Sequence, residues 1–140
     1  NQSGVARAYF PIDLVHQTTE YMNQELAKDG AKIDALFFCP HYAKGEVAEY
    51  SKVCNCRKPK TGMIDQACEK FDIDLEKSFM VGDRHTDIEF GHHCNLKTVL
   101  VKTGYGRGEV DYIMPKREIQ PMHIAEDLPE AVSWIIEQGQ

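Results

Sequence analysis

Two short apolar runs separated by a single helix-length stretch constrain the fold more than any other part of the sequence. The runs cover residues 78–81 and 97–101, and residues 85–94 between them have helical spacing. Buried strands that alternate with helices of about ten residues are typical of parallel β-α-β units. The sequence therefore predicts an α/β fold with a mostly parallel sheet.

Further elements fit this pattern. Apolar residues at helical spacing predict helices over residues 12–28 and 62–71, and an apolar run predicts a buried strand over residues 33–39. Asp127 as N-cap, Pro129 in the first turn and Glu130 as the partner in a capping box predict a last helix. Glycines at 104, 106 and 108 predict a mobile loop, and residues 109–122 carry no clear pattern. We expect one domain over residues 1–140.

Composition limits the classes of partner. The chain has 42% hydrophobic and 27% charged residues and a net charge of -6. This balance argues against a nucleic-acid or anionic-membrane surface, while the local cluster of Arg57, Lys58, Lys60 and Arg84 can still bind a small anion. With no long apolar run or signal pattern, we expect a cytoplasmic protein without a membrane partner, and a monomer.

Two close pairs of residues have side chains that suit a metal. Cys39 and His41 form one pair, Cys54 and Cys56 form the other, and residues 39–56 make up the loop that joins them. Four such ligands can close a tetrahedral zinc site, although each pair is spaced more tightly than is usual. The alternative is that the cysteines pack as small hydrophobic side chains. An odd total of five cysteines favours metal binding in a reducing compartment over a disulfide framework.

Gly82 and Asp83 follow the apolar run 78–81, and Asp87 completes a Gly-Asp-x-x-x-Asp pattern. Function in open α/β sheets lies at the carboxyl ends of strands, and a carboxylate there, beside Arg84, suits a Mg²⁺ ion that also touches a phosphate. The alternative is that Asp83 caps the following helix.

Other candidates are weaker. Asp72 and Asp74 form an Asp-x-Asp pair, but they follow a helix, which favours loop and N-cap roles over phosphoryl chemistry. His85, His92 and His93 lie on one helix-like segment, where solvent-facing or packed histidines are commoner than ligands.

Taken together, these motifs resemble the haloacid dehalogenase superfamily of phosphatases, and within it the branch of heptose bisphosphatases and related histidinol-phosphatases. The resemblance rests on Asn-Gln-Ser-Gly-Val-Ala-Arg at 1–7, Tyr9-Phe10, Cys39-Pro40-His41, Cys54-x-Cys56-Arg57-Lys58-Pro59, Gly62-Met63, Met80-Val81-Gly82-Asp83 and residues 99–104. It implies a Rossmann-like three-layer fold around a mostly parallel sheet, here without the N-terminal strands.

The resemblance also implies roles for individual residues. Zn²⁺ would be held by Cys39, His41, Cys54 and Cys56, and Mg²⁺ by Asp83 with support from Asp87. Lys58 would stabilise the transferring phosphoryl group, and the substrate would be bound by Asn1, Gln2, Ser3, Arg57, Lys58 and Arg84.

The implied reaction is Mg²⁺-dependent hydrolysis of a small sugar bisphosphate through an aspartyl-phosphate intermediate. The resemblance places the nucleophile and the acid/base aspartate before residue 1, so we expect residues 1–140 to be inactive alone. Ser3 favours the heptose branch, because the histidinol-phosphatase type tends to have an acidic residue there. The alternatives are hydrolysis of histidinol phosphate or another small phosphate monoester, and a non-catalytic zinc-containing phosphate-binding module.

Overall fold

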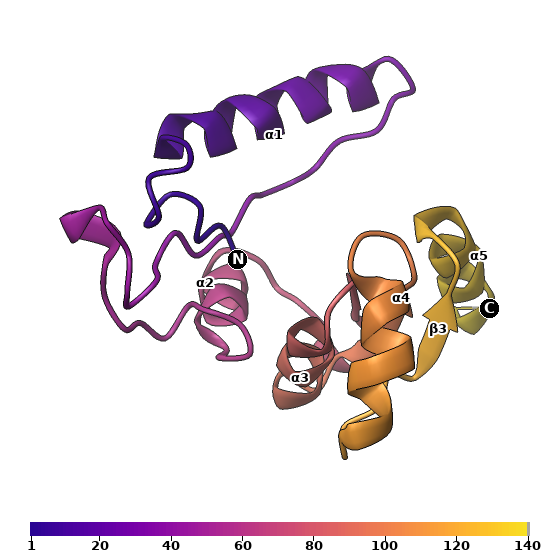
Figure 1. The fold of residues 1–140 in the computed structure, drawn as a ribbon. Coiled ribbons are helices and arrows are strands. Elements are labelled where there is room, and N and C mark those ends of the chain that lie inside the picture. Colours follow the sequence, from indigo (N-terminus) through magenta and orange to yellow (C-terminus); the bar gives the residue numbers. More distant parts are fainter. Residues whose placement is uncertain (140) are drawn as a thin grey trace. The chain divides into compact units, whose positions relative to one another are not determined.

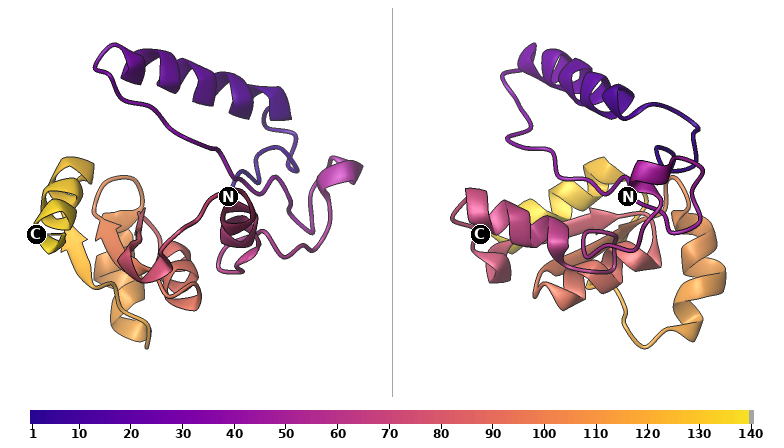
Figure 2. Two further views of the ribbon diagram at one scale, coloured as in Figure 1. Left: turned by 180° about the vertical axis from the view of Figure 1, so that it is seen from behind. Right: turned by 90° about the vertical axis from the view of Figure 1, so that its left-hand side faces the viewer.

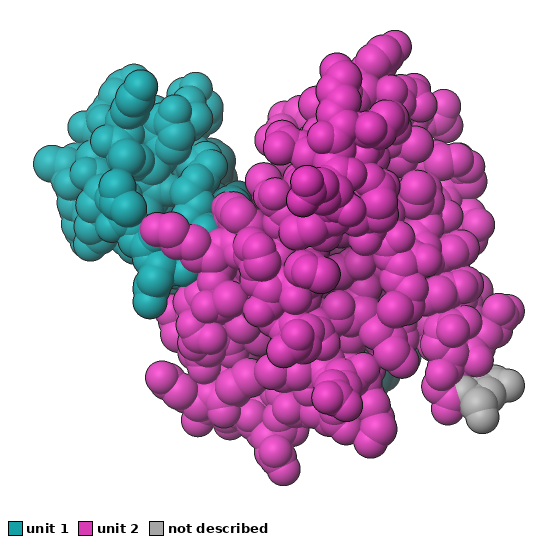
Figure 3. All heavy atoms as spheres, turned by 90° about the horizontal axis from the view of Figure 1, so that it is seen from below, with its two compact units in different colours: residues 1–57 teal, residues 58–140 magenta. Residues whose placement is uncertain are grey.

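The computed structural model describes residues 1–139. The chain divides into two compact units, residues 1–57 and residues 58–140, which Figure 3 colours separately. The loop 39–56 lies wholly in the first unit. The single domain over residues 1–140 stays a prediction.

The first unit contains one long helix, α1 (Ile12–Ala27), and a short 3₁₀ turn at Ala48–Tyr50. The predicted helix over residues 12–28 is confirmed to within one residue. It is closed by Gly30 in the left-handed region, at φ +71°, and by a bond from the Ala31 amide to the Leu26 carbonyl. An irregular segment then runs back along the helix (Figure 1).

The strand predicted over residues 33–39 is wrong. These residues form no regular element; the Ile33 amide donates to the Asn23 side chain, and the Cys39 carbonyl accepts the Gln2 amide. A strand needs a neighbouring strand to pair its backbone, and within residues 1–139 this segment has none.

The second unit is built on three parallel strands in the order β1-β2-β3. They are β1 (Phe79–Gly82), β2 (Lys97–Val101) and β3 (His123–Ala125). Phe79 pairs with Lys97, and Val99 pairs with His123. Helices α2 (Gly62–Lys70), α3 (His85–His93) and α5 (Leu128–Gln138) belong to the same unit. The predicted mostly parallel sheet and the strand over residues 97–101 are confirmed.

Side chains that alternate along β2 make the two faces of the sheet. Val99 and Val101 pack with Ala125 and Ala131 on the face covered by α5. Leu100 points to the other face, where it packs with Ile88 of α3 and with Met114. Helices therefore cover both faces, which gives the three layers implied by the resemblance (Figure 2).

The stretch between β2 and β3 differs from the prediction. A helical turn, α4 (Gly106–Gly108), opens directly after Tyr105 and continues through Glu109–Ile113 and Met114–Lys116. The expected loop over residues 104–108 is therefore helical from Gly106 onward. Strand β3 has only three residues, and the sequence pattern did not predict it.

The last helix begins as predicted. The Asp127 carboxylate accepts the Glu130 amide at 3.0 Å, and a proline lies in the first turn. The Glu130 carboxylate accepts the amide of Glu126 at 2.9 Å, so the cap is reciprocal but reaches one residue further than the usual capping box.

Candidate functional site

The four predicted metal ligands converge in the first unit. The Cys39 sulfur lies 3.5 Å from the Cys54 sulfur and 3.8 Å from His41 Nδ1. The Cys56 sulfur lies 3.4 Å from the Cys54 sulfur and 3.3 Å from His41 Nδ1. All four ligand atoms lie within 4.8 Å of one another, so the group could hold a metal ion.

Backbone hydrogen bonds tie the segment at residues 1–7 to this loop. The Gln2 amide donates to the Cys39 carbonyl at 2.8 Å. The Ala6 carbonyl accepts the amides of Glu46 and Val47 at 2.7 and 3.0 Å. The predicted substrate-binding segment 1–3 and the metal-binding loop are thus one folded piece.

The pKa values of the ligands depend mainly on burial. Burial raises the pKa of the Cys39 thiol, and it raises the pKa of the Cys56 thiol to about 12. Burial also opposes ionisation of Cys54, but hydrogen bonds with Cys56 and Cys39 outweigh it and lower the Cys54 pKa. Burial lowers the pKa of His41, so its imidazole is neutral at pH 7. A metal that binds here must therefore displace thiol protons.

Arg57 extends from the loop directly after Cys56. Its Nη1 atom donates to the His41 carbonyl at 3.3 Å, and its guanidinium lies over the ring of Tyr42, 5.6 Å from the centroid. The metal-binding residues therefore also fix the position of this predicted substrate-binding arginine.

Asp83 lies in the second unit, at the carboxyl end of β1. Its Oδ2 atom accepts the Tyr105 amide at 2.9 Å, and the N-cap of α3 is Arg84. Asp83 does not cap the helix, so that alternative is wrong. A methyl group on Gly104, whose φ is +61°, would lie 2.3 Å from Asp83 Oδ2. The loop after β2 is thus shaped around this carboxylate.

Asp87 and Lys58 form a largely buried ion pair near the carboxyl end of β1. Lys58 Nζ lies 2.7 Å from Asp87 Oδ1, and Asp87 Oδ2 accepts the Arg84 amide at 3.1 Å. The backbone of Gly82 passes so close to Asp87 that an added Cβ would lie 2.4 Å from the Asp87 Cβ. Asp87 therefore orients Lys58 and caps α3.

The structure groups the predicted site residues by unit. Asn1, Gln2, Ser3 and Arg57 belong to the first unit, where Gln2 is bonded to Cys39, and Lys58, Asp83, Arg84 and Asp87 lie at the end of β1 in the second. The Arg84 guanidinium stacks on the Tyr105 ring, 3.7 Å from the centroid.

The sequence did not indicate a role for Tyr105, and it favoured only packed or solvent-facing roles for His85 and His93. Tyr105 holds both Asp83 and Arg84, as described above. His93 Nδ1 lies 3.1 Å from the Pro59 carbonyl, next to Lys58, and His85 is buried with its amide bonded to Glu109. The only available signal for Tyr105 was its place in a glycine-rich loop after a strand.

The weaker candidates behave as the sequence predicted. Asp74 caps a 3₁₀ turn through the Lys77 amide and pairs with the Lys77 side chain at the surface. His92 is exposed on α3, as expected for a solvent-facing histidine.

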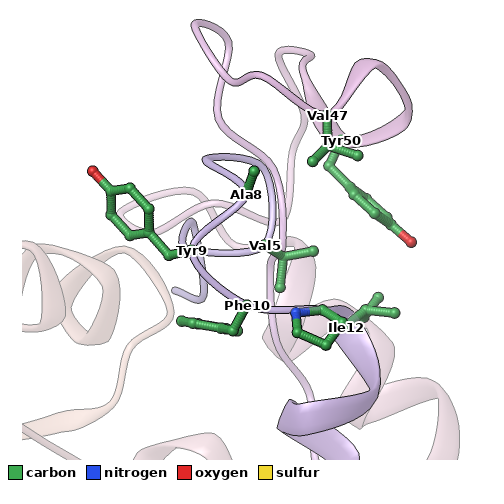
Figure 4. Close-up of a pocket in the computed structure, with 8 residues that line it drawn as sticks. Val5, Ala8, Tyr9, Phe10, Ile12, Val47 and Tyr50 are labelled. Atoms are coloured by element: carbon green, nitrogen blue, oxygen red, sulfur yellow. The ribbon is translucent and has the colours of Figure 1, made fainter.

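A hollow of about 440 Å³ lies near the start of α1 in the first unit (Figure 4). Its lining includes no charged side chain; it consists of Val5, Ala8, Tyr9, Phe10, Pro11, Ile12, Val47 and Tyr50. Tight phosphate binding usually relies on cations or several aligned N–H donors, and the lining of this hollow includes no cationic side chain.

The chain is similar in sequence to a protein family and to several known proteins. The model of the HAD-hydrolase-like family matches residues 55–131. A D-glycero-beta-D-manno-heptose-1,7-bisphosphate 7-phosphatase of Pasteurella multocida is 44% identical over 120 residues, which are 81% of this chain and 65% of the relative. A D-glycero-D-manno-heptose-1,7-bisphosphate 7-phosphatase of Thermosynechococcus vestitus is 42% identical, over 96% of this chain and 70% of the relative. The match thus spans about two thirds of these relatives' length.

Solved structures are also similar. The crystal structure of a D,D-heptose 1,7-bisphosphate phosphatase from B. bronchiseptica, complexed with magnesium and phosphate, has a TM-score of 0.82. It is 29% identical, and the match covers 99% of this chain and 72% of that one. None of the helices within residues 1–139 is long and apolar enough to span a membrane.

Proposed function

The chain belongs to the HAD-hydrolase-like family, and from this membership we propose that the protein is a Mg²⁺-dependent phosphatase that removes the 7-phosphate of D-glycero-D-manno-heptose 1,7-bisphosphate. The observation that carries the proposal is the grouping of Asp83, Lys58 and Asp87 at the carboxyl end of β1. A small phosphorylated sugar is its proposed partner, and we propose a cytoplasmic monomer.

The donor set at β1 fits Mg²⁺. Mg²⁺ usually takes one or two protein carboxylates together with substrate phosphate oxygens and water. Asp83 is half-buried, and one of its oxygens is engaged by the Tyr105 amide, which fixes the carboxylate's orientation. When bound, the ion would neutralise charge on the phosphate. Magnesium and phosphate in the B. bronchiseptica enzyme support this assignment.

The residues of this chain bind and orient the phosphoryl group. The Lys58 ammonium stabilises the negative charge on the phosphoryl oxygens, and Asp87 holds that ammonium in place. Arg84, fixed on Tyr105, supplies a second cation within the same unit. The resemblance places the attacking aspartate before residue 1, and the proposed reaction depends on that aspartate.

The metal at Cys39, His41, Cys54 and Cys56 is proposed to be structural Zn²⁺. Zn–S bonds of about 2.3 Å in a tetrahedron place two sulfurs about 3.8 Å apart. The observed separations of 3.4 and 3.5 Å between neighbouring sulfurs are close to that value. The ion would close the loop and fix the position of Arg57. Zinc would thus help to shape the substrate site and would take no part in the reaction.

Phosphate release tests this function directly. The full-length protein, loaded with zinc, would be given the heptose bisphosphate and Mg²⁺, and its rate compared with that for histidinol phosphate. We expect a clear preference for the bisphosphate. Equal rates on both substrates would contradict the proposed specificity, and no release from either would favour the non-catalytic module.

A further inference from the structure

Two segments at the carboxyl end of the sheet are joined by a reciprocal pair of hydrogen bonds. The first segment runs from Asp83 to His85 after β1, and the second runs from Tyr105 to Glu109 after β2. The Asp83 carboxylate accepts the Tyr105 amide at 2.9 Å. In the opposite sense, the Glu109 carboxylate accepts the His85 amide at 3.1 Å. Each segment therefore supplies one carboxylate and one amide to the other, and the two bonds form a clamp.

The second segment is a single, closely packed turn. The Tyr105 carbonyl accepts the Glu109 amide at 3.1 Å, which closes the turn. A Cβ on Gly106 would clash with the Val101 carbonyl, so the turn lies directly against the end of β2. The Arg84 guanidinium packs on the Tyr105 ring, 3.7 Å from its centroid. A displacement of Glu109 would therefore carry the Tyr105 amide with it.

The first segment is held at the start of α3. His85 is the first residue of this helix, so its amide has no acceptor within the helix. The Glu109 carboxylate supplies that acceptor and meets the partial positive charge of the helix N-terminus. The His85 side chain is only 6% exposed, and its Nδ1 atom lies 3.5 Å from Glu89 Oε2. Because Asp83 lies two residues before His85, the bond to Glu109 fixes the turn that carries Asp83.

We propose that Glu109 is a positioning residue for the Mg²⁺-binding carboxylate: its bond to the His85 amide holds the two segments together and keeps Asp83 in the orientation that the Tyr105 amide sets. This proposal rests on the proposed function for the assignment of Mg²⁺ to Asp83. Loss of a hydrogen bond that orients a metal-binding group typically costs about tenfold to a hundredfold in metal affinity. The alternative is that Glu109 only stabilises the start of α3, as a carboxylate near a helix N-terminus generally does.

Binding of Mg²⁺ alone tests the positioning role. Mg²⁺ would be titrated into the full-length, zinc-loaded protein without substrate, and the Kd read by calorimetry and from the Tyr105 amide signal in NMR. We expect Glu109→Ala to raise the Kd about tenfold. Glu109→Gln keeps an oxygen that accepts the His85 amide and should bind Mg²⁺ nearly as tightly as the wild type. A Kd that rises equally in both variants, or in neither, overturns the proposal.

Two control variants separate positioning from charge and from stability. Asp111 lies on the same helical stretch as Glu109, is exposed, and takes part in no side-chain hydrogen bond or ion pair within residues 1–139, so Asp111→Ala should leave the Kd unchanged. Asp127→Ala also removes a carboxylate that accepts an amide at a helix start. It should lower the midpoint of urea unfolding about as much as Glu109→Ala and keep the Kd. An equal rise of the Kd in Asp127→Ala or Asp111→Ala would overturn the positioning role.

Amide hydrogen exchange tests the clamp without metal or turnover. We expect Glu109→Ala to speed the exchange of the His85 and Tyr105 amides together, by about tenfold, and Glu109→Gln to restore slow exchange at both. Faster exchange at His85 with no change at Tyr105 would show that the two bonds are independent and would overturn the proposal. Failure of the wild type to hydrolyse the bisphosphate would overturn the proposed function, whereas the exchange rates and the Mg²⁺ titration would still decide the role of Glu109.

Discussion

Lys58 Nζ and Asp87 Oδ1 lie 2.7 Å apart, and their side chains are only 17% and 8% exposed. Removing one partner of a largely buried pair leaves the other charge without compensation, which costs about 3–5 kcal/mol. Asp87→Ala should therefore lower the free energy of unfolding by about that amount and abolish most activity. Asp34→Ala is the matched control, because its pair with Lys32 is 66% and 77% exposed and should contribute little to stability. If urea unfolding shows that the two variants lose the same free energy of unfolding, the structural role of Asp87 is contradicted.

Gly104 should be required for the Asp83 geometry. An alanine there would place its Cβ 2.3 Å from Asp83 Oδ2 and would also have to adopt a φ of +61°. We expect Gly104→Ala to weaken Mg²⁺-dependent activity at least tenfold.

Two glycine controls separate the causes of that effect. Gly30 has a φ of +71° with no atom near the added Cβ, so Gly30→Ala should carry backbone strain of about 1–2 kcal/mol and keep the activity. Gly108→Ala has neither problem and should leave activity and stability nearly unchanged or slightly improved. Full activity of Gly104→Ala would show that Asp83 does not need this close approach.

His93 should position Lys58 through the Pro59 carbonyl. The Nδ1–O distance is 3.1 Å, and a bond of this kind contributes about 0.5–1.5 kcal/mol. His93→Ala should therefore lower kcat about twofold to tenfold, and His93→Asn, which places an N–H donor near the same point, should restore it. His92→Ala, on the same helix and exposed, is the control. If His93→Asn is no better than His93→Ala, the loss has another cause.

Thiol labelling should distinguish the five cysteines. Cys68 is exposed, whereas burial raises the pKa of Cys94 to about 11, so Cys94 stays protonated and unreactive at pH 8. In zinc-loaded protein we expect iodoacetamide to modify Cys68 alone, as read by mass spectrometry. A chelator should add Cys54, whose pKa is lowered, whereas burial raises the pKa of the Cys39 and Cys56 thiols and should keep both slow to react. The raised pKa of Cys94 predicts that its labelling rate increases with pH, by about tenfold per pH unit below pH 11. Labelling of Cys54 at the rate of Cys68 in the loaded protein would argue against the metal site.

The sequence predicted those elements whose side chains specify them locally. The bounds of strand β2 were predicted correctly because apolar side chains on both of its faces are buried. Helix α5 begins where its N-cap residue Asp127 indicated. The pattern at residues 33–39 was apolar in the same way, but a strand also depends on a partner that local sequence does not contain. Strand β3 was missed because three residues carry too little pattern.

The candidate site was predicted in part for the same reason. Cys39, His41, Cys54 and Cys56 have side chains whose chemistry is recognisable at short spacing, and the structure brings them together. Tyr105 was missed because its amide reaches Asp83 across 22 positions, and a backbone donor has no sequence signature. Arg7 was quoted only as part of a motif, because its contact with Tyr42 arises from tertiary folding.

Release of inorganic phosphate from D-glycero-D-manno-heptose 1,7-bisphosphate by the full-length protein and its Asp83→Asn variant tests the account most directly. Asparagine keeps an acceptor for the Tyr105 amide but removes the negative charge, so the fold and the zinc content should be unchanged. We predict Mg²⁺-dependent release by the wild type and at least a hundredfold lower rate in the variant. A variant that retains a near-normal Mg²⁺-dependent rate would contradict the assignment of Asp83 and the mechanism built on it.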